Sequence, residues 1–167
     1  MSHDPGLRVG TGFDVHPFAD GRALVIGGVT IPHECGLAGH SDADVLSHAI
    51  CDALLGAAAL GDIGRHFPDS DPAFRGISSL ELLRRTVGII AAAGWSPLQI
   101  DTCILAEAPR IAPHEPAMRA AIAAALGIPV GNVGIKATTT EGLGFVGRGE
   151  GIAAQAVCLI VRDADTP

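Results

Sequence analysis

Hydrophobic and polar residues recur with two different periods along this chain. A period of two, which is typical of strands, marks residues 8–16, and we predict further strands at residues 99–106, which have β-branched positions, and at residues 133–138. A period near 3.6, which is typical of helices, marks three others: residues 41–60, 78–93 and 113–126. Residues 152–161 are almost all apolar, as expected of a strand that is buried on both faces. The chain therefore mixes helices with strands.

The order of these segments predicts the fold class. Two short apolar runs around Gly27-Gly28 indicate a hairpin, and the later half of the chain alternates between strand and helix patterns. We predict an α+β fold, with a single twisted β-sheet and helices packed on one face, in a ferredoxin-like βαβ arrangement. The 167 residues suffice for one domain, which we place at residues 7–163 between flexible tails at 1–6 and 164–167.

Composition excludes several classes of protein. Hydrophobic residues make up 48% of the chain and charged residues 17%, which argues against disorder. The net charge of −7 argues against a nucleic-acid partner, because such partners need a basic surface. No apolar segment approaches the ~20 residues that span a bilayer, so we expect no membrane span, and the polar start shows no signal peptide. The four cysteines have no CxxC spacing, which favours reduced thiols and a cytoplasmic location.

Asp14 and His16 are the first candidates for chemistry. Residues two apart in a strand share a face, so the carboxylate and the imidazole point the same way. Gly10 and Gly12 leave that face uncluttered. The pair could supply two metal ligands, or it could be a strand-end turn with a solvated histidine.

A second candidate group lies on the helix predicted at 41–60. Asp44, His48 and Asp52 are spaced i, i+4 and i+8, so they share one helix face. They could form an exposed polar stripe, or His48 could be a metal ligand oriented by a neighbouring acid. Asp14, His16 and His48 together would make a three-ligand site with an open position, as a catalytic Zn²⁺ requires.

Two further segments could bind a phosphorylated ligand. Residues 136–151 contain a lysine, an arginine, three adjacent threonines and several glycines, which suit an anion, and Glu141 could hold a divalent ion. A dinucleotide fingerprint around Gly142 is rejected, because the segment leads into a strand-like run. Residues 60–72 could be a substrate-binding loop. In both segments a purely structural loop is the alternative, and the chain has no G-x-S-x-G nucleophile motif.

Five motifs together resemble the 2-C-methyl-D-erythritol 2,4-cyclodiphosphate synthase family. They are Gly12-Phe-Asp14-Val-His16, Gly39-His40-Ser41-Asp42-Ala-Asp44-Val-Leu-Ser-His48, the segment from Asp52 to Gly64, Phe67-Pro68-Asp69, and Lys136-Ala-Thr-Thr-Thr-Glu141. The resemblance extends over residues 8–161. The residues alone lead only to a metal-dependent enzyme that acts on a phosphorylated small molecule.

The resemblance implies a reaction of the non-mevalonate isoprenoid pathway. In 4-diphosphocytidyl-2-C-methyl-D-erythritol 2-phosphate, the 2-phosphate would attack the β-phosphorus, close a cyclic diphosphate and release CMP. Zn²⁺ or another divalent ion would be held by Asp14, His16 and His48. Mg²⁺ or Mn²⁺ would bridge the diphosphate near Glu141, and His40 and Thr139 match positions that stabilise the transition state.

The resemblance also implies the substrate contacts and the assembly. The contacts would come from Ser41, Asp52, Asp62, Ile63, Gly64, Phe67, Pro68, Asp69, Ser70, Asp71, Ala106, Glu107, Ala108, Pro109, Arg110, Ile111, Ala112, Thr138 and Thr140. The family is a homotrimer with active sites between subunits, and Phe145 and Arg148 match residues that line a cavity on the trimer axis. Arg110 stands where lysine is common in the family.

Two other functions stay open at this point. One is a metal-dependent phosphatase or cyclic-nucleotide hydrolase, which would use the same residues to activate water and would release inorganic phosphate. The other is a non-catalytic trimer that binds a nucleotide or an isoprenoid, whose ligand affinity would not depend on metal.

Overall fold

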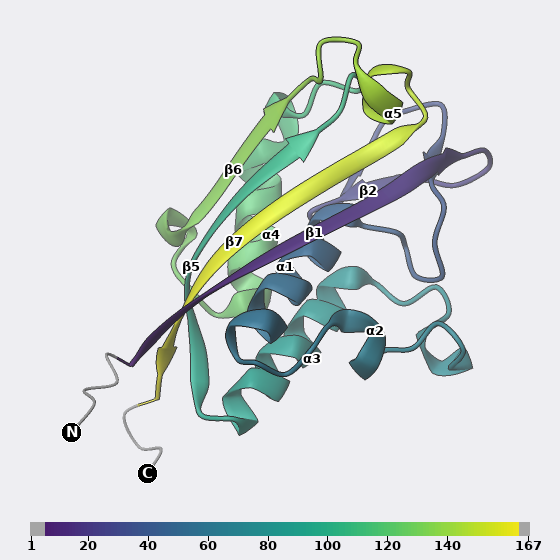
Figure 1. Ribbon diagram of the computed structural model, residues 1–167. Helices are drawn as coiled ribbons and strands as arrows, with labels where there is room; N and C mark the ends of the chain where they lie inside the picture. The colour runs from purple at the N-terminus through teal and green to yellow at the C-terminus, as the bar shows by residue number, and fades with distance from the viewer. Residues whose placement is uncertain (1–5, 164–167) are drawn as a thin grey trace.

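A five-stranded sheet forms the centre of the computed structural model, which describes residues 6–163 (Figure 1). Its strands lie in the order β4 (Gly36–Leu37), β1 (Leu7–Ala19), β7 (Gly151–Arg162), β5 (Trp95–Leu105) and β6 (Val133–Thr138). β5 and β6 are parallel, and the other neighbouring strands are antiparallel. The predicted hairpin is present as β2 (Leu24–Ile26) and β3 (Val29–Ile31). The expected tails at 1–6 and 164–167 lie, apart from Gly6, outside the described residues.

Three long helices lie on one face of the sheet (Figure 1). They are α1 (Val45–Ala57), α3 (Ser79–Ala92) and α4 (Glu115–Leu126). Short helical segments complete the set: α2 (Ile63–His66), η1 (Pro72–Phe74), η2 (Ala112–His114), η3 (Val130–Asn132) and α5 (Gly144–Gly147). The mixed fold with helices on one face is therefore confirmed, and β5–α4–β6 is its βαβ unit. None of the described helices has the length and apolar character needed to cross a bilayer.

Glycines bring α1 unusually close to β1. A Cβ atom at Gly10 would lie 2.1 Å from the Ala53 carbonyl oxygen, and one at Gly12 would lie 1.9 Å from that of Ala49. Both distances are far below van der Waals contact, so only glycine fits at these positions. The expected uncluttered face of β1 is thus filled by the helix, and Asp14 and His16 follow on the same face beyond the contact.

The first long helix begins later than its periodicity predicts. α1 starts at Val45, and Asp44 is its N-cap, with Oδ1 accepting the Leu46 and Ser47 backbone N–H groups at 3.1 Å each. The same carboxylate accepts the N–H groups of Gly27 at 2.9 Å and Gly28 at 2.7 Å, in the turn between β2 and β3. Asp44 therefore ties the hairpin to the start of α1, and residues 41–43 form the approach to the helix.

The prediction that residues 152–161 are buried on both faces is wrong for the middle of β7. Gln155 is exposed and Val157 is 38% exposed, while Ala154, Ala156 and Cys158 face the helices and are buried. Part of the second face of the sheet is therefore open in the described chain, although Ala153, near the start of β7 on that same face, is buried. On β1 this open face also carries Val9 and Phe13, which are 67% and 58% exposed.

Candidate metal centre and active site

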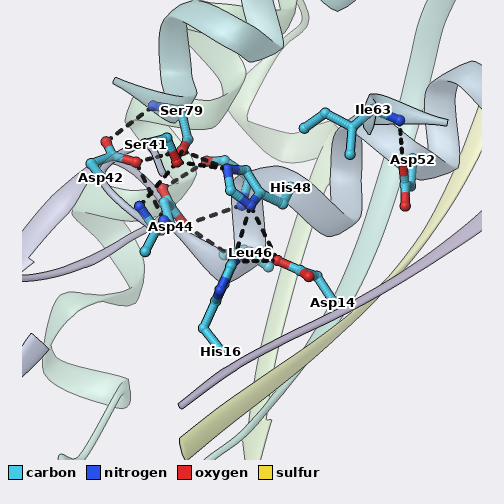
Figure 2. Close-up of polar contacts among 12 residues, drawn as sticks. Asp14, His16, Ser41, Asp42, Asp44, Leu46, His48, Asp52, Ile63 and Ser79 are labelled. Atoms are coloured by element: carbon cyan, nitrogen blue, oxygen red, sulfur yellow. Dashed lines mark hydrogen bonds and ion pairs between the residues drawn. The ribbon is translucent and has the colours of Figure 1, made fainter. Parts of the chain in front are cut away.

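Asp14, His16 and His48 converge on one point between β1 and α1 (Figure 2). Asp14 Oδ2 lies 2.9 Å from His16 Nε2 and 3.2 Å from His48 Nδ1, and the two ring nitrogens lie 3.2 Å apart. Their side chains are 26%, 17% and 14% exposed, so the three atoms are sheltered yet reachable. The three ligands that the sequence predicts are therefore brought together.

The local fold explains why these atoms meet. The period of two on β1 places Asp14 and His16 on the face toward α1, and the close approach at Gly10 and Gly12 brings the helix down onto that face. His48 lies in the first turn of α1, where its backbone N–H bonds to the Asp44 carbonyl at 3.1 Å. The cap at Asp44 thus sets the direction in which the His48 ring leaves the helix.

The three groups shift one another's proton affinity. Burial opposes ionisation of Asp14, but hydrogen bonds from His16 and His48 outweigh it and hold the pKa of this carboxyl well below its usual range. Burial likewise opposes protonation of His48, but the hydrogen bond and negative charge of Asp14 prevail and raise the pKa of this imidazole. The two shifts are opposite sides of one attraction, in which the ionised Asp14 carboxylate and the imidazoles favour each other's charged forms.

The donor set fits a divalent metal ion. A tetrahedral Zn²⁺ with bonds of about 2.0–2.1 Å to nitrogen and oxygen separates neighbouring ligand atoms by about 3.3 Å. The observed separations of 2.9, 3.2 and 3.2 Å are close to that value. One carboxylate and two imidazoles leave a fourth position for a substrate atom. The geometry therefore supports a metal site with an open position.

The other ring nitrogen of His48 contacts two serines. His48 Nε2 lies 2.9 Å from Ser79 Oγ and 3.1 Å from Ser41 Oγ. Ser79 in turn donates its hydroxyl proton to Asp42 Oδ1 and its backbone N–H to Asp42 Oδ2, the latter at 3.0 Å. The sequence analysis did not assign this role to Ser79 or Asp42, because Ser79 lies 31 positions from His48 and 37 from Asp42.

The predicted polar stripe on α1 does not form around His48. Asp44 is fully buried at the helix cap, as described above. Asp52 Oδ1 accepts the Ile63 N–H at 2.7 Å, and burial raises the pKa of its carboxyl. The oxygen atoms beside the outer nitrogen of His48 therefore come from Ser41 and Ser79.

A cavity of about 350 Å³ opens beside the three converging side chains. Most of its lining is predicted by the sequence: Asp14, His16, His40, Ser41, His48, Ile63, Gly64, Phe67, Pro68 and Asp69. The remaining lining residues carry no chemical signature and were not predicted as site residues: Gly39, which appears only within a family motif, Phe74 and Leu82. His40 lines this cavity, and its Nε2 is buried without a hydrogen-bond partner among the described residues.

Four residues that were expected to contact the substrate do not line the cavity, and three of them hydrogen-bond to backbone groups of this chain. Asp62 caps α2 by accepting the Arg65 N–H at 3.0 Å, and Asp71 caps the η1 turn by accepting the Ala73 N–H at 2.9 Å. Asp52 holds Ile63, and Ser70 lies between the two caps, with an exposed side chain. These residues shape the loop that carries Ile63, Phe67 and Asp69.

A second group of predicted residues lies away from this cavity, in the loops after β5 and β6. Glu107 Oε1 accepts the Thr140 N–H at 2.9 Å, the Thr140 hydroxyl at 3.2 Å and the Gly142 N–H at 3.4 Å. The hydrogen bond from the Thr140 backbone is the main reason why the pKa of Glu107 lies below its ordinary value. Glu107 therefore joins the 106–112 segment to the threonine loop, Thr138–Gly142.

The threonine loop itself is exposed. The Glu141 N–H donates to Thr139 Oγ1 at 3.3 Å, and the Thr139 hydroxyl lies 3.5 Å from Glu141 Oε1. Beyond it, Phe145 is 38% exposed, and Arg148 forms an ion pair with Glu150 at 2.7 Å. Ile111, Ala112, Glu115, Ile135, Lys136 and Ala137 line a separate hollow of about 310 Å³. None of residues 106–112 or 138–148 lines the metal cavity in this chain.

Comparison with known proteins connects this arrangement to a family. A sequence model of the YgbB family matches residues 7–161. The chain is 61% identical to the 2-C-methyl-D-erythritol 2,4-cyclodiphosphate synthase of Burkholderia thailandensis over 158 residues, covering 95% of this chain and 98% of that one. It is 63% identical to the Bordetella petrii protein of the same name, covering 93% and 96%.

Solved structures agree with the fold. The bifunctional IspDF of Campylobacter jejuni matches with a TM-score of 0.90 and 42% identity, over 93% of this chain and 42% of that larger one. A CDP-bound form of a 2C-methyl-D-erythritol-2,4-cyclodiphosphate synthase matches with a TM-score of 0.84 and 37% identity, over 92% and 99%. With a family match over residues 7–161 and relatives that align over nearly their whole length, the chain belongs to the YgbB family, whose curated relatives are 2-C-methyl-D-erythritol 2,4-cyclodiphosphate synthases.

Proposed function

We propose that this chain closes the cyclic diphosphate of 2-C-methyl-D-erythritol 2,4-cyclodiphosphate at the Asp14, His16 and His48 centre. The 2-phosphate oxygen of 4-diphosphocytidyl-2-C-methyl-D-erythritol 2-phosphate attacks the β-phosphorus. A new P–O bond forms as the bond to the α-phosphate oxygen breaks, and CMP leaves. The observation that carries this proposal is the set of three ligand atoms 2.9–3.2 Å apart at the edge of a cavity large enough for a phosphorylated sugar.

The reaction needs no nucleophile from the protein, and the two buried cysteines are poorly suited to that role. Burial raises the pKa of Cys51 to about 12 and that of Cys158 to about 11, so neither thiol ionises readily at neutral pH. Catalysis then depends on placing the two phosphates in line and on stabilising the charge between them.

The residues around the cavity divide this work. Asp14, His16 and His48 would hold Zn²⁺ or another divalent ion, which when bound acts as a Lewis acid on a phosphate oxygen. His40 lines the cavity, and as the family resemblance implies it would stabilise the transition state; its Nε2 has no hydrogen-bond partner among the described residues. Ser41 lies beside it at the cavity wall and can donate its hydroxyl to a phosphate.

The remaining part of the site would come from a neighbouring copy of the chain. Thr139 would donate to the developing charge, Glu141 would hold Mg²⁺ or Mn²⁺ against the diphosphate, and residues 106–112 would receive the cytosine. In a homotrimer these segments of one subunit would face the metal cavity of the next. Two features support this assembly: those segments are exposed and separate from the cavity, and the open sheet face carries the apolar side chains Val9, Phe13 and Val157.

A product assay tests the proposal. The purified chain is incubated with substrate, Zn²⁺ and Mg²⁺, CMP is measured by chromatography, and the cyclic diphosphate is identified by ³¹P NMR. We expect equal amounts of CMP and cyclic product, and loss of both after chelation. Release of inorganic phosphate in place of CMP would contradict the proposal and favour a phosphatase or hydrolase.

A further inference from the structure

We propose that Ser79 and Asp42 are positioning residues that fix which nitrogen of His48 is free to bind the metal ion. This inference rests on the proposed function, since it assumes a cation at the Asp14, His16 and His48 centre. It concerns two residues that do not line the cavity and do not touch the reacting atoms. Figure 2 shows the chain of contacts that links Asp42 through Ser79 to the His48 ring.

The donors and acceptors allow one arrangement of protons. His48 Nδ1 faces Asp14 Oδ2 and His16 Nε2, each at 3.2 Å, so it must present a lone pair if a cation is to bind there. The ring proton must then reside on Nε2, which lies 2.9 Å from Ser79 Oγ. In this arrangement the His48 Nε2–H group donates a hydrogen bond to Ser79 Oγ.

Asp42 determines the direction of the hydrogen bond between His48 and Ser79. An ionised carboxylate can only accept, so the close contact between Ser79 Oγ and Asp42 Oδ1 requires the serine hydroxyl to donate to Asp42. With its own proton committed to Asp42, Ser79 Oγ can offer only a lone pair to His48. By accepting the Ser79 proton, the Asp42 carboxylate makes Ser79 an acceptor for the His48 Nε2–H group. This favours the tautomer that leaves Nδ1 without a proton.

This anchor is rigid because it is also a helix start. Ser79 is the first residue of α3, is fully buried, and donates its backbone N–H to Asp42 Oδ2 at 3.0 Å. The N-cap residue Ser78 makes no side-chain cap of its own, so Asp42 supplies that acceptor from a distant segment. The Asp42 N–H in turn donates to the Ile77 carbonyl at 3.1 Å. Two segments are therefore held together on either side of the His48 ring.

Ser41 is a second, weaker partner of the same ring nitrogen. Its Oγ lies 3.1 Å from His48 Nε2, but it also accepts the Ala43 N–H at 3.1 Å and has no carboxylate behind it. Loss of Ser79 would leave the ring proton to Ser41 alone. Outer partners of a metal-binding histidine commonly affect metal affinity by about 10- to 100-fold, which sets the size of the expected effect.

Metal affinity measures the effect without using turnover. Ser79→Ala, Asp42→Asn and the double variant are prepared without metal, and their dissociation constants for Zn²⁺ and Co²⁺ are found by competition with a chelating indicator. Ser47→Ala is the matched control, because Ser47 is also fully buried and its hydroxyl also donates to a carboxylate, Asp44 Oδ2 at 2.7 Å. Thermal unfolding of each metal-free protein reports on the fold.

We expect Ser79→Ala to weaken Zn²⁺ binding by about 10- to 100-fold and to alter the Co²⁺ absorption spectrum. Asp42→Asn should weaken Zn²⁺ binding by several-fold. The double variant should bind Zn²⁺ about as weakly as Ser79→Ala alone, because Asp42 acts on His48 only through Ser79. Ser47→Ala should lower the melting temperature while keeping metal affinity within about twofold.

The outcomes separate this inference from the proposed function. If the unmodified chain binds no Zn²⁺, the metal centre itself is wrong. If it binds Zn²⁺ and Ser79→Ala binds equally well with the same Co²⁺ spectrum, the positioning role is overturned while the metal centre stands. If Ser79→Ala does not fold, Asp42→Asn decides: unchanged affinity in that variant overturns the inference. Strictly additive losses in the double variant would remove Asp42 from the chain of contacts.

Discussion

The metal cavity and the threonine loop are two parts of one proposed active site, yet they are built in opposite ways. Around the cavity, Asp14, His16 and His48 are largely buried and belong to a strand and a helix that pack through glycines. In the threonine loop, Thr139 and Glu141 are exposed and belong to a connection between elements.

This difference indicates what each part needs from its surroundings. Burial and the contacts of α1 and α3 hold Asp14, His16 and His48 in place within one chain, as the proposed metal site requires. The threonine loop depends on the bonds that Glu107 makes to Thr140 and Gly142, and its functional side chains have few partners. The core of the protein positions the first half, whereas the second is held by hydrogen bonds within the loop and by the Glu107 carboxylate.

The largest effect should come from the metal half. His48→Ala removes one of three ligands, so we expect Zn²⁺ to be lost and CMP release to fall by at least about a thousandfold. Circular dichroism and the oligomer size should remain unchanged, because His48 is partly exposed at the cavity edge. Metal analysis and the CMP assay check the prediction; a variant that keeps its metal and its activity would show that the centre is assigned wrongly.

A smaller effect should follow from the threonine loop. Thr139→Val removes one hydroxyl donor with little change in volume, and we expect kcat to fall by roughly ten- to a thousandfold. Zn²⁺ content should stay at one per chain, since the loop does not line the metal cavity. If this variant loses metal, the two halves do not act separately. If its kcat equals that of the unmodified enzyme, Thr139 has no part in catalysis.

The smallest effect should come from the carboxylate that supports the loop. Glu107→Ala removes the acceptor for three hydrogen bonds, and we expect kcat to fall by about tenfold with metal affinity unchanged. Glu107→Gln keeps an acceptor oxygen and should recover most of the loss. If both variants raised KM for the substrate equally and left kcat unchanged, Glu107 would contact the substrate instead.

The sequence predicted the metal half well because short-range rules determine it. A period of two placed Asp14 beside His16, and the helix pattern placed His48 on an element that had to pack nearby. The resemblance to a family then identified His40 and the lining residues Ile63, Phe67 and Asp69. These assignments depend on spacing along the chain, which is visible in one sequence.

The rest depends on contacts between distant segments, which spacing does not encode. Asp44 resembled a member of a polar stripe, but its carboxylate is committed to the turn at Gly27 and Gly28. Ser79 touches His48 across 31 positions, and Asp42 reaches Ser79 across 37. The apolar pattern of β7 suggested two buried faces, but Gln155 and Val157 on the second face are exposed in the middle of the strand.

The central claim is that each active site joins the metal half of one subunit to the threonine loop of another. Mixed trimers test it most directly. His48→Ala chains and chains carrying both Thr139→Val and Glu141→Ala, each inactive alone, are unfolded together, refolded in equal amounts and assayed for CMP release. Random assembly would restore both intact halves at about a quarter of the interfaces, so we predict activity near a quarter of the unmodified enzyme's. Activity no higher than that of the separate variants would show that each site lies within one chain and would contradict the account.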